Sequence, residues 1–129
     1  MRLLLDTHVA VWAVSNSLGL PGHIRELIAD PIHEVYVSAV SILEIAIKRA
    51  SSGRDPPPFS GAEAMDYFRQ VGFALLDVTP EHAAGVEKLP MIHRDPFDRL
   101  LVAQCLAEPL RLVTHDQKVA AYSDTIMLF

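Results

Sequence analysis

The sequence predicts an α/β fold with a central, mainly parallel sheet and helices on both of its faces. Short apolar runs alternate with helical patterns along the chain, and this alternation is typical of such sheets. Half of the 129 residues are hydrophobic, which suffices to fill one packed core. The proline tract at residues 56–58 is expected to be a loop between two helical segments. It does not divide the chain into two domains, because neither half could bury a core of its own. We therefore expect one domain over residues 1–129.

Each element is predicted from the spacing of its apolar residues and from the turn residues that flank it. The predicted strands are residues 2–6, 34–38, 73–78, 111–114 and 125–129. The predicted helices are a short one through Val9, Trp12 and Ala13, then 21–30, a long one near 39–50, 62–71, 80–88, 96–107 and 117–122. In open parallel sheets ligands bind beyond the carboxyl ends of the strands, so functional residues are expected there.

Composition narrows the classes of function. Sixteen acidic residues against eleven basic ones give a net charge of −5, which argues against nucleic-acid binding through charge alone. Eight of the basic residues are arginines, which suit phosphate contacts, so a local basic patch is still compatible with the composition. The single cysteine, Cys105, excludes an intrachain disulfide, and no apolar run reaches the roughly 18 residues of a membrane helix. We expect a soluble, cytoplasmic domain.

Two aspartates follow predicted strands directly. Asp6 comes after an apolar run, and Asp116 comes after the strand at residues 111–114. Either aspartate can cap the helix that it precedes, because its side chain accepts hydrogen bonds from free backbone N–H groups. Alternatively, both project from the carboxyl edge of the sheet as ligands or nucleophiles. If their strands are neighbours, the two side chains converge, which capping alone explains less well.

The segment HRDPFDRLLVAQ, residues 93–104, holds two further aspartates. Asp95 fits the N-cap and Pro96 the first position of a helix, so capping accounts for Asp95. Asp98 lies one turn into that helix, on or near a face that carries apolar residues. A carboxylate on an inward face needs a partner, and a cation is the obvious one.

Glu44 is a fourth candidate acid, inside the apolar helical segment VSILEIAIKRA. It shares a stripe with Ser41 and Lys48, which is also compatible with a solvated face and an exposed Glu44–Lys48 pair. Grouped carboxylates repel one another unless a divalent cation is present, and Mg²⁺ and Mn²⁺ prefer oxygen ligands. One or two such ions can activate water and stabilise a phosphodiester under attack. Bound ions also allow a net-acidic chain to bind an anion locally.

Four segments resemble the PIN-domain ribonucleases, and in particular the VapC-type toxins of type II bacterial toxin–antitoxin systems: LLLDTHVAVW, VSAVSILEIAIK, HRDPFDRLLVAQ and LVTHD. The resemblance covers essentially the whole chain. It implies a three-layer α/β/α fold and a Mg²⁺- or Mn²⁺-dependent endoribonuclease that hydrolyses RNA with metal-activated water. It also implies that the metal-holding, catalytic residues are Asp6, Glu44, Asp98 and Asp116. Thr114 would orient a metal-bound water or a carboxylate.

The same resemblance implies partners. A VapB-type antitoxin would cover the active groove, RNA would be the substrate, and a homodimer would align two sites. Such a dimer could gather arginines beside the acids, and we hypothesise that Arg94 and Arg99 contact RNA.

Other interpretations remain open. A catalytically silent PIN-like protein-binding module would share the fold but would have no reason to keep unneutralised carboxylates. An aspartate-dependent phosphatase would need a second aspartate two residues after Asp6, where this chain has His8. The six histidines lack the spacing of a zinc motif, so they are expected to be scattered over surface and core.

Overall fold

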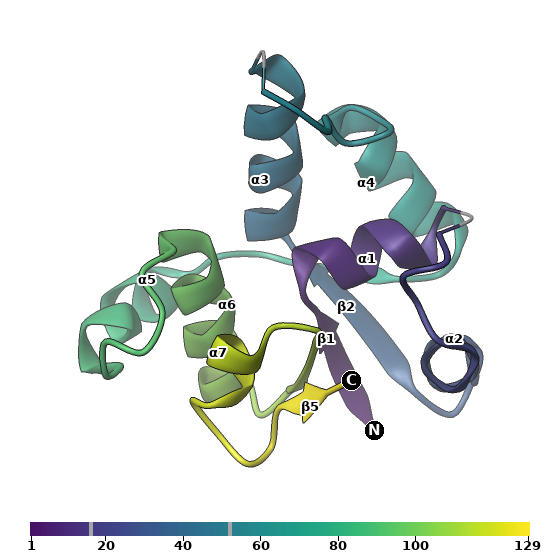
Figure 1. Ribbon diagram of the computed structural model, residues 1–129. Helices are drawn as coiled ribbons and strands as arrows, with labels where there is room; N and C mark the ends of the chain where they lie inside the picture. The colour runs from purple at the N-terminus through teal and green to yellow at the C-terminus, as the bar shows by residue number, and fades with distance from the viewer. Residues whose placement is uncertain (16, 52) are drawn as a thin grey trace.

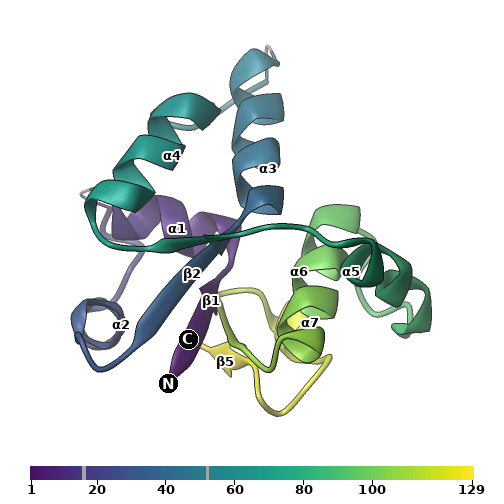
Figure 2. The same cartoon turned by 180° about the vertical axis from the view of Figure 1, so that it is seen from behind.

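A five-stranded parallel sheet in the order β3-β2-β1-β4-β5 forms the centre of the molecule (Figure 1). The computed structural model describes residues 1–15, 17–51 and 53–129. Residues 16 and 52 lie outside the described part of the chain. The strands are β1 Arg2–Leu5, β2 Glu34–Ser38, β3 Ala74–Leu76, β4 Arg111–Thr114 and β5 Met127–Leu128. Helices flank both faces of the sheet, which confirms the predicted three-layer α/β/α fold (Figure 2).

The helices follow the predicted order. They are α1 Thr7–Ala13, α2 Gly22–Ala29, α3 Ala39–Ala50, α4 Gly61–Gln70, α5 Pro80–Gly85, α6 Pro96–Ala107 and α7 Gln117–Ala120, with a short 3₁₀ helix at Val86–Lys88. The predicted helix at 80–88 is therefore split between α5 and the 3₁₀ turn. The predicted strands at 73–78 and 125–129 are too long, because β3 and β5 are edge strands and only residues with a backbone partner extend the ladder.

Alternate residues of β1 fill two separate cores. Leu3 and Leu5 point to one face of the sheet, where they pack among α1, α2 and α4. Leu4 points to the other face, against α6 and α7. This is the two-residue period of a strand covered on both sides, and it explains why β1 is a continuous apolar run.

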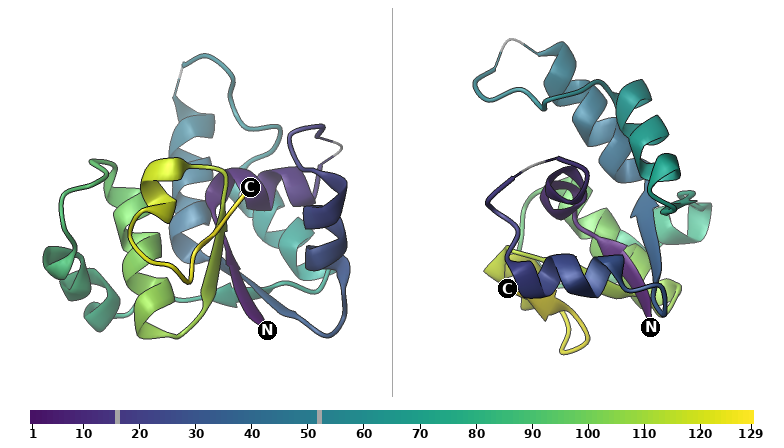
Figure 3. Two further views of the ribbon diagram at one scale, coloured as in Figure 1. Left: turned by 60° about the horizontal axis from the view of Figure 1, so that its bottom comes forward. Right: turned by 90° about the vertical axis from the view of Figure 1, so that its right-hand side faces the viewer.

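The helix α3 is fixed at its start and along one side. Ser38 ends β2 and caps α3 by accepting a hydrogen bond from the Val40 N–H at 3.0 Å. Further along, α4 lies beside α3 (Figure 3). At Gly61 a Cβ atom would lie 3.1 Å from the Ala46 Cβ and 3.3 Å from the Ile42 carbonyl oxygen, so a larger residue there would push the two helices slightly apart. These contacts set the position of Glu44 on α3.

All pairings in the sheet are parallel, so the carboxyl ends of the strands lie at one edge. The central strand β1 pairs with β2 on one side and β4 on the other, so chain connections diverge in opposite directions beside it. This is the topological position where ligand sites form in α/β proteins. Within the described residues, no helix is both long and apolar enough to cross a membrane.

Candidate active site

Asp6 is a buried carboxylate held between β1 and β4. Its Oδ1 accepts the Thr7 N–H at 2.7 Å, and its Oδ2 accepts the Thr114 hydroxyl at 2.6 Å. The Thr114 oxygen in turn accepts the Asp116 N–H at 3.0 Å, which links the two strand-end aspartates. Burial raises the pKa of Asp6 above its ordinary value, although the hydrogen bonds from Thr114 and Thr7 oppose the shift. Asp6 is therefore both a cap and an inward-facing acid.

Glu44 forms the predicted pair with Lys48, but it does so from a buried position. Its Oε2 accepts a hydrogen bond from Lys48 Nζ at 2.7 Å, so the expected pair forms. However, the carboxylate is buried rather than solvated, with only 6% of the side chain exposed. Its Oε1 is also buried and meets no hydrogen-bond donor among the residues that the structure describes. An unpartnered buried carboxylate oxygen is costly, and a cation would remove that cost.

Asp98 lies in the first turn of α6 and is only 17% exposed. Its neighbour Asp95 is the N-cap, as predicted, and accepts the Phe97 N–H at 2.8 Å. Burial, together with the negative charges of Asp6 and Asp95, raises the pKa of Asp98 to about 7. A pKa shift of this size at a cavity wall is typical of carboxylates in functional sites.

Asp116 lies at the rim of the site, where it caps α7. Its Oδ1 accepts the Lys118 N–H at 2.8 Å, and its Oδ2 lies 3.1 Å from His93 Nε2. Partial burial acts to raise the pKa of Asp116. The hydrogen bonds from Lys118 and His93 outweigh it, so the pKa of Asp116 is lowered.

His93 belongs to the site, although the sequence did not single it out. Its Nε2 lies 3.1 Å from Asp98 Oδ2 and 3.1 Å from Asp116 Oδ2. Ligand atoms of these three residues all lie within 4.8 Å of one another. The sequence signal that could have indicated His93 is its position two residues before the Asp95 cap, which places it close to the start of α6 and therefore to Asp98.

The four predicted acids line one cavity of about 750 Å³ at the carboxyl edge of the sheet, together with His93. Trp12 lines the same cavity, with its indole packed on Gly19 on one side and 6.0 Å from the rings of His8 and His115. The donor set is carboxylate-rich and holds an unpartnered buried oxygen, so it fits a divalent cation with a preference for oxygen.

The structure contradicts the hypothesis that Arg99 contacts RNA. Arg99 is buried, and its guanidinium donates to the carbonyl oxygens of Val86, Leu89 and Pro90 and to the Tyr122 hydroxyl. It therefore ties the segment before α6 to that helix. Arg94 lies on the surface next to His93, which is compatible with an RNA contact.

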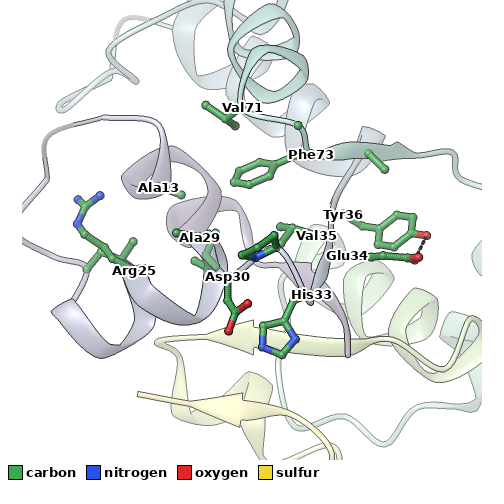
Figure 4. Close-up of a pocket in the computed structure, with 15 residues that line it drawn as sticks. Ala13, Arg25, Ala29, Asp30, His33, Glu34, Val35, Tyr36, Val71 and Phe73 are labelled. Atoms are coloured by element: carbon green, nitrogen blue, oxygen red, sulfur yellow. Dashed lines mark hydrogen bonds between the residues drawn. The ribbon is translucent and has the colours of Figure 1, made fainter.

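A second cavity, of about 880 Å³, lies away from the acids (Figure 4). It is bounded by α2, the start of β2 and the segment after α4, with Val71 and Phe73 on one side and Asp30 and His33 on another. It contains none of the four predicted acids, so we place the candidate active site in the first cavity.

The fold and the site together define a class: parallel α/β proteins with an acidic cavity beyond the carboxyl ends of the central strands. The sequence profile of the PIN domain matches residues 3–124. The chain belongs to the PIN-domain family.

Solved structures with the same fold include toxin–antitoxin proteins. VapBC2 from Rickettsia felis, bound to a DNA fragment from its promoter, contains a similar chain with 17% identity and a TM-score of 0.70, covering 100% of this chain and 98% of that one. For VapBC-5 from Mycobacterium tuberculosis the identity is 17% and the TM-score 0.61, with 99% and 97% covered. For PAE2754 from Pyrobaculum aerophilum they are 20% and 0.60, with 98% and 83% covered. No curated protein matches the sequence.

Proposed function

We propose that this chain is a divalent-metal-dependent endoribonuclease, a single PIN domain that acts as the toxin of a toxin–antitoxin pair. The observation that carries the proposal is the convergence of Asp6, Glu44, Asp98 and Asp116 on one cavity, where the buried Glu44 Oε1 has no partner in the described part of the chain. Carboxylate oxygens are the ligands that Mg²⁺ and Mn²⁺ prefer. Membership of the PIN-domain family supports nuclease chemistry.

Each residue that the sequence predicted for the site, apart from the buried Arg99, has a role in this proposal. The four carboxylates would hold Mg²⁺ or Mn²⁺, with Asp6, Glu44 and Asp98 inside and Asp116 at the rim. When bound, the cation supplies activation of water and stabilisation of the charge on the phosphodiester. Thr114 keeps Asp6 in place through its hydroxyl. The exposed guanidinium of Arg94 would contact an RNA phosphate.

The proposed partners are a VapB-type antitoxin, the RNA substrate and a second copy of the chain, acting in the cytoplasm. Support for the antitoxin comes from the structures of similar fold, since two of them are described as VapBC proteins.

Thermal melting tests the metal site without a known substrate. We expect Mn²⁺ or Mg²⁺ to raise the melting temperature of the wild type relative to EDTA, because a ligand at about 100 times its dissociation constant adds roughly 2.7 kcal/mol of stability. Asp98→Asn should abolish this rise. Asp95→Asn is the matched control. Asp95 serves as the cap of α6 and asparagine also caps helices, so this variant should keep the metal-dependent rise.

The same proteins are then assayed for cleavage of single-stranded RNA, with the expectation that the wild type and Asp95→Asn cleave it and Asp98→Asn does not. A wild type that neither binds metal nor cleaves RNA would overturn the proposal. It would favour a silent PIN-like binding module.

A further inference from the structure

The hydrogen bonds around His93 fix which ring nitrogen carries its proton. Its Nδ1 lies 3.0 Å from the Asp95 backbone nitrogen. A backbone N–H can only donate, so Nδ1 must accept and cannot itself carry a hydrogen. The proton of the neutral ring is therefore on Nε2.

That Nε2–H faces two carboxylates at once. Asp98 Oδ2 and Asp116 Oδ2 each lie 3.1 Å from it, and the His93 side chain is only 17% exposed. The two aspartates come from different helices, one in the first turn of α6 and the other at the start of α7. A protonated nitrogen has no free lone pair, so in this arrangement His93 is a hydrogen-bond donor and not a metal ligand.

We propose that His93 is a positioning residue: its Nε2–H holds the carboxylates of Asp98 and Asp116 together and leaves the cation to oxygen ligands alone. The inference rests on the proposed function. The acids differ in what their oxygens contact: both oxygens of Asp116 accept protein donors, His93 and the Lys118 N–H, and both oxygens of Asp6 do the same. In contrast, Glu44 keeps a buried oxygen without a donor in the described part of the chain.

The alternative is that His93 joins Asp98 and Asp116 as a nitrogen ligand, since the three groups lie close enough to share an ion. Coordination through Nε2 would require its proton to leave or to move to Nδ1. A proton on Nδ1 would point at the Asp95 N–H, and two donors would then face each other at 3.0 Å. The capping turn before α6 would have to change to relieve that contact.

Nitrogen-15 NMR of histidine-labelled protein distinguishes the two arrangements. The imidazole signals of His93 are assigned with His93→Gln, and Mg²⁺ is then added to the full-length protein until binding is complete. We expect Nε2 to stay protonated and Nδ1 to stay unprotonated at saturation. A proton that shifts to Nδ1, or a loss of the Nε2–H signal on Mg²⁺ binding, would overturn the proposal.

Metal affinity provides a second readout. Titration calorimetry with Mn²⁺ should give a dissociation constant about 10–100 times weaker for His93→Ala than for the wild type, the usual effect of losing a residue that orients metal ligands. His93→Gln retains a side-chain N–H donor and should recover part of that loss. His23→Gln is the control and should bind Mn²⁺ like the wild type, because His23 is exposed on α2 and does not line the acidic cavity.

Folding of each variant is checked first by melting in EDTA. Unchanged affinity in both His93 variants would overturn the positioning role while leaving the nuclease proposal intact. A wild type that binds neither metal would instead overturn the proposed function, and this inference with it.

Discussion

Two histidines of this molecule use the same local device in different surroundings. The His82 Nδ1 accepts the Thr79 N–H at 3.1 Å, and its Nε2 lies 2.7 Å from Glu108 Oε2. The His93 Nδ1 accepts the Asp95 N–H at 3.0 Å, and its Nε2 faces acids as well. In both cases the backbone amide selects the nitrogen that points at a carboxylate.

The difference is the number of acids that each ring has to satisfy. His82 is fully buried and meets one carboxylate, that of Glu108, while the Gln104 amide packs beside it. His93 meets two carboxylates, and three more, those of Asp6, Glu44 and Asp95, line the same cavity. The single Nε2–H of His82 matches its one carboxylate, whereas the single Nε2–H of His93 faces more carboxylates than it can satisfy. A histidine–carboxylate contact therefore indicates a structural role where every acid has a donor. Where acids outnumber donors, it indicates a candidate functional site.

The largest expected effect is on catalytic activity, and it distinguishes the acids around His93 from the contact between His82 and Glu108. Asp98→Asn should abolish detectable RNA cleavage while the protein stays folded, because it removes a carboxylate from the cavity. Glu108→Gln should keep the activity, since Glu108 is remote from the cavity and serves α5 and α6. Both variants are measured with one RNA substrate under saturating Mg²⁺. Full activity in Asp98→Asn would remove Asp98 from the site.

The second expected effect is on stability. His82→Ala should lower the free energy of unfolding by about 2–3 kcal/mol, because it leaves Glu108, Gln104 and the Thr79 N–H without their partner. Urea denaturation measures this change. The rise in melting temperature on adding Mn²⁺ should persist, since His82 does not line the acidic cavity. If the metal response disappeared as well, the two groups would not be independent.

The third expected effect depends on pH and on the absence of metal. The pKa of Asp98 is raised to about 7 in the folded state, from an ordinary value of 3.8. The folded state therefore binds the proton more tightly than the unfolded chain. This contribution to stability is fully present below pH 3.8 and is lost as the pH rises through 7.

In EDTA, Asp98→Asn should consequently melt close to the wild type near pH 4 and several degrees above it near pH 8. Asp95→Asn serves as the reference for removing a nearby charge. A constant difference across this range would show that Asp98 titrates normally.

The smallest expected effect concerns Lys48. It tests whether Lys48 compensates the charge of the cavity acids, as His82 does for Glu108. Lys48 is half exposed and pairs with Glu44 Oε2 one helical turn away. Lys48→Met should lower the free energy of unfolding by about 1 kcal/mol, more than the few tenths of an exposed pair because Glu44 is buried, but still modest because Lys48 is half exposed. The metal-dependent rise in melting temperature should be retained. A much larger loss of stability would mean that Lys48 neutralises the cavity.

Local rules predicted the features that depend on neighbouring residues. The cap at Asp95 follows from residue type and position alone, and it forms. The layered fold follows from the alternation of apolar runs with helical patterns. The convergence of Asp6 and Asp116 follows from two strand ends at one edge, once β1 and β4 are known to pair.

The features that the sequence could not predict depend on contacts between distant elements. Arg99 was expected to contact RNA, but it donates to carbonyl groups of the preceding segment, whose path cannot be predicted from hydrophobic periodicity. The stripe pattern left the burial of Glu44 open, because burial depends on what packs over α3. His93 was missed because its two acids belong to separate helices.

Trp12 is the single tryptophan of the chain, and it lines the acidic cavity between the rings of His8 and His115. The indole emission of the folded protein therefore reports on the surroundings of the site. The molecule carries its own optical reporter, which can follow the arrival of a cation, a nucleotide or a partner peptide without any added label.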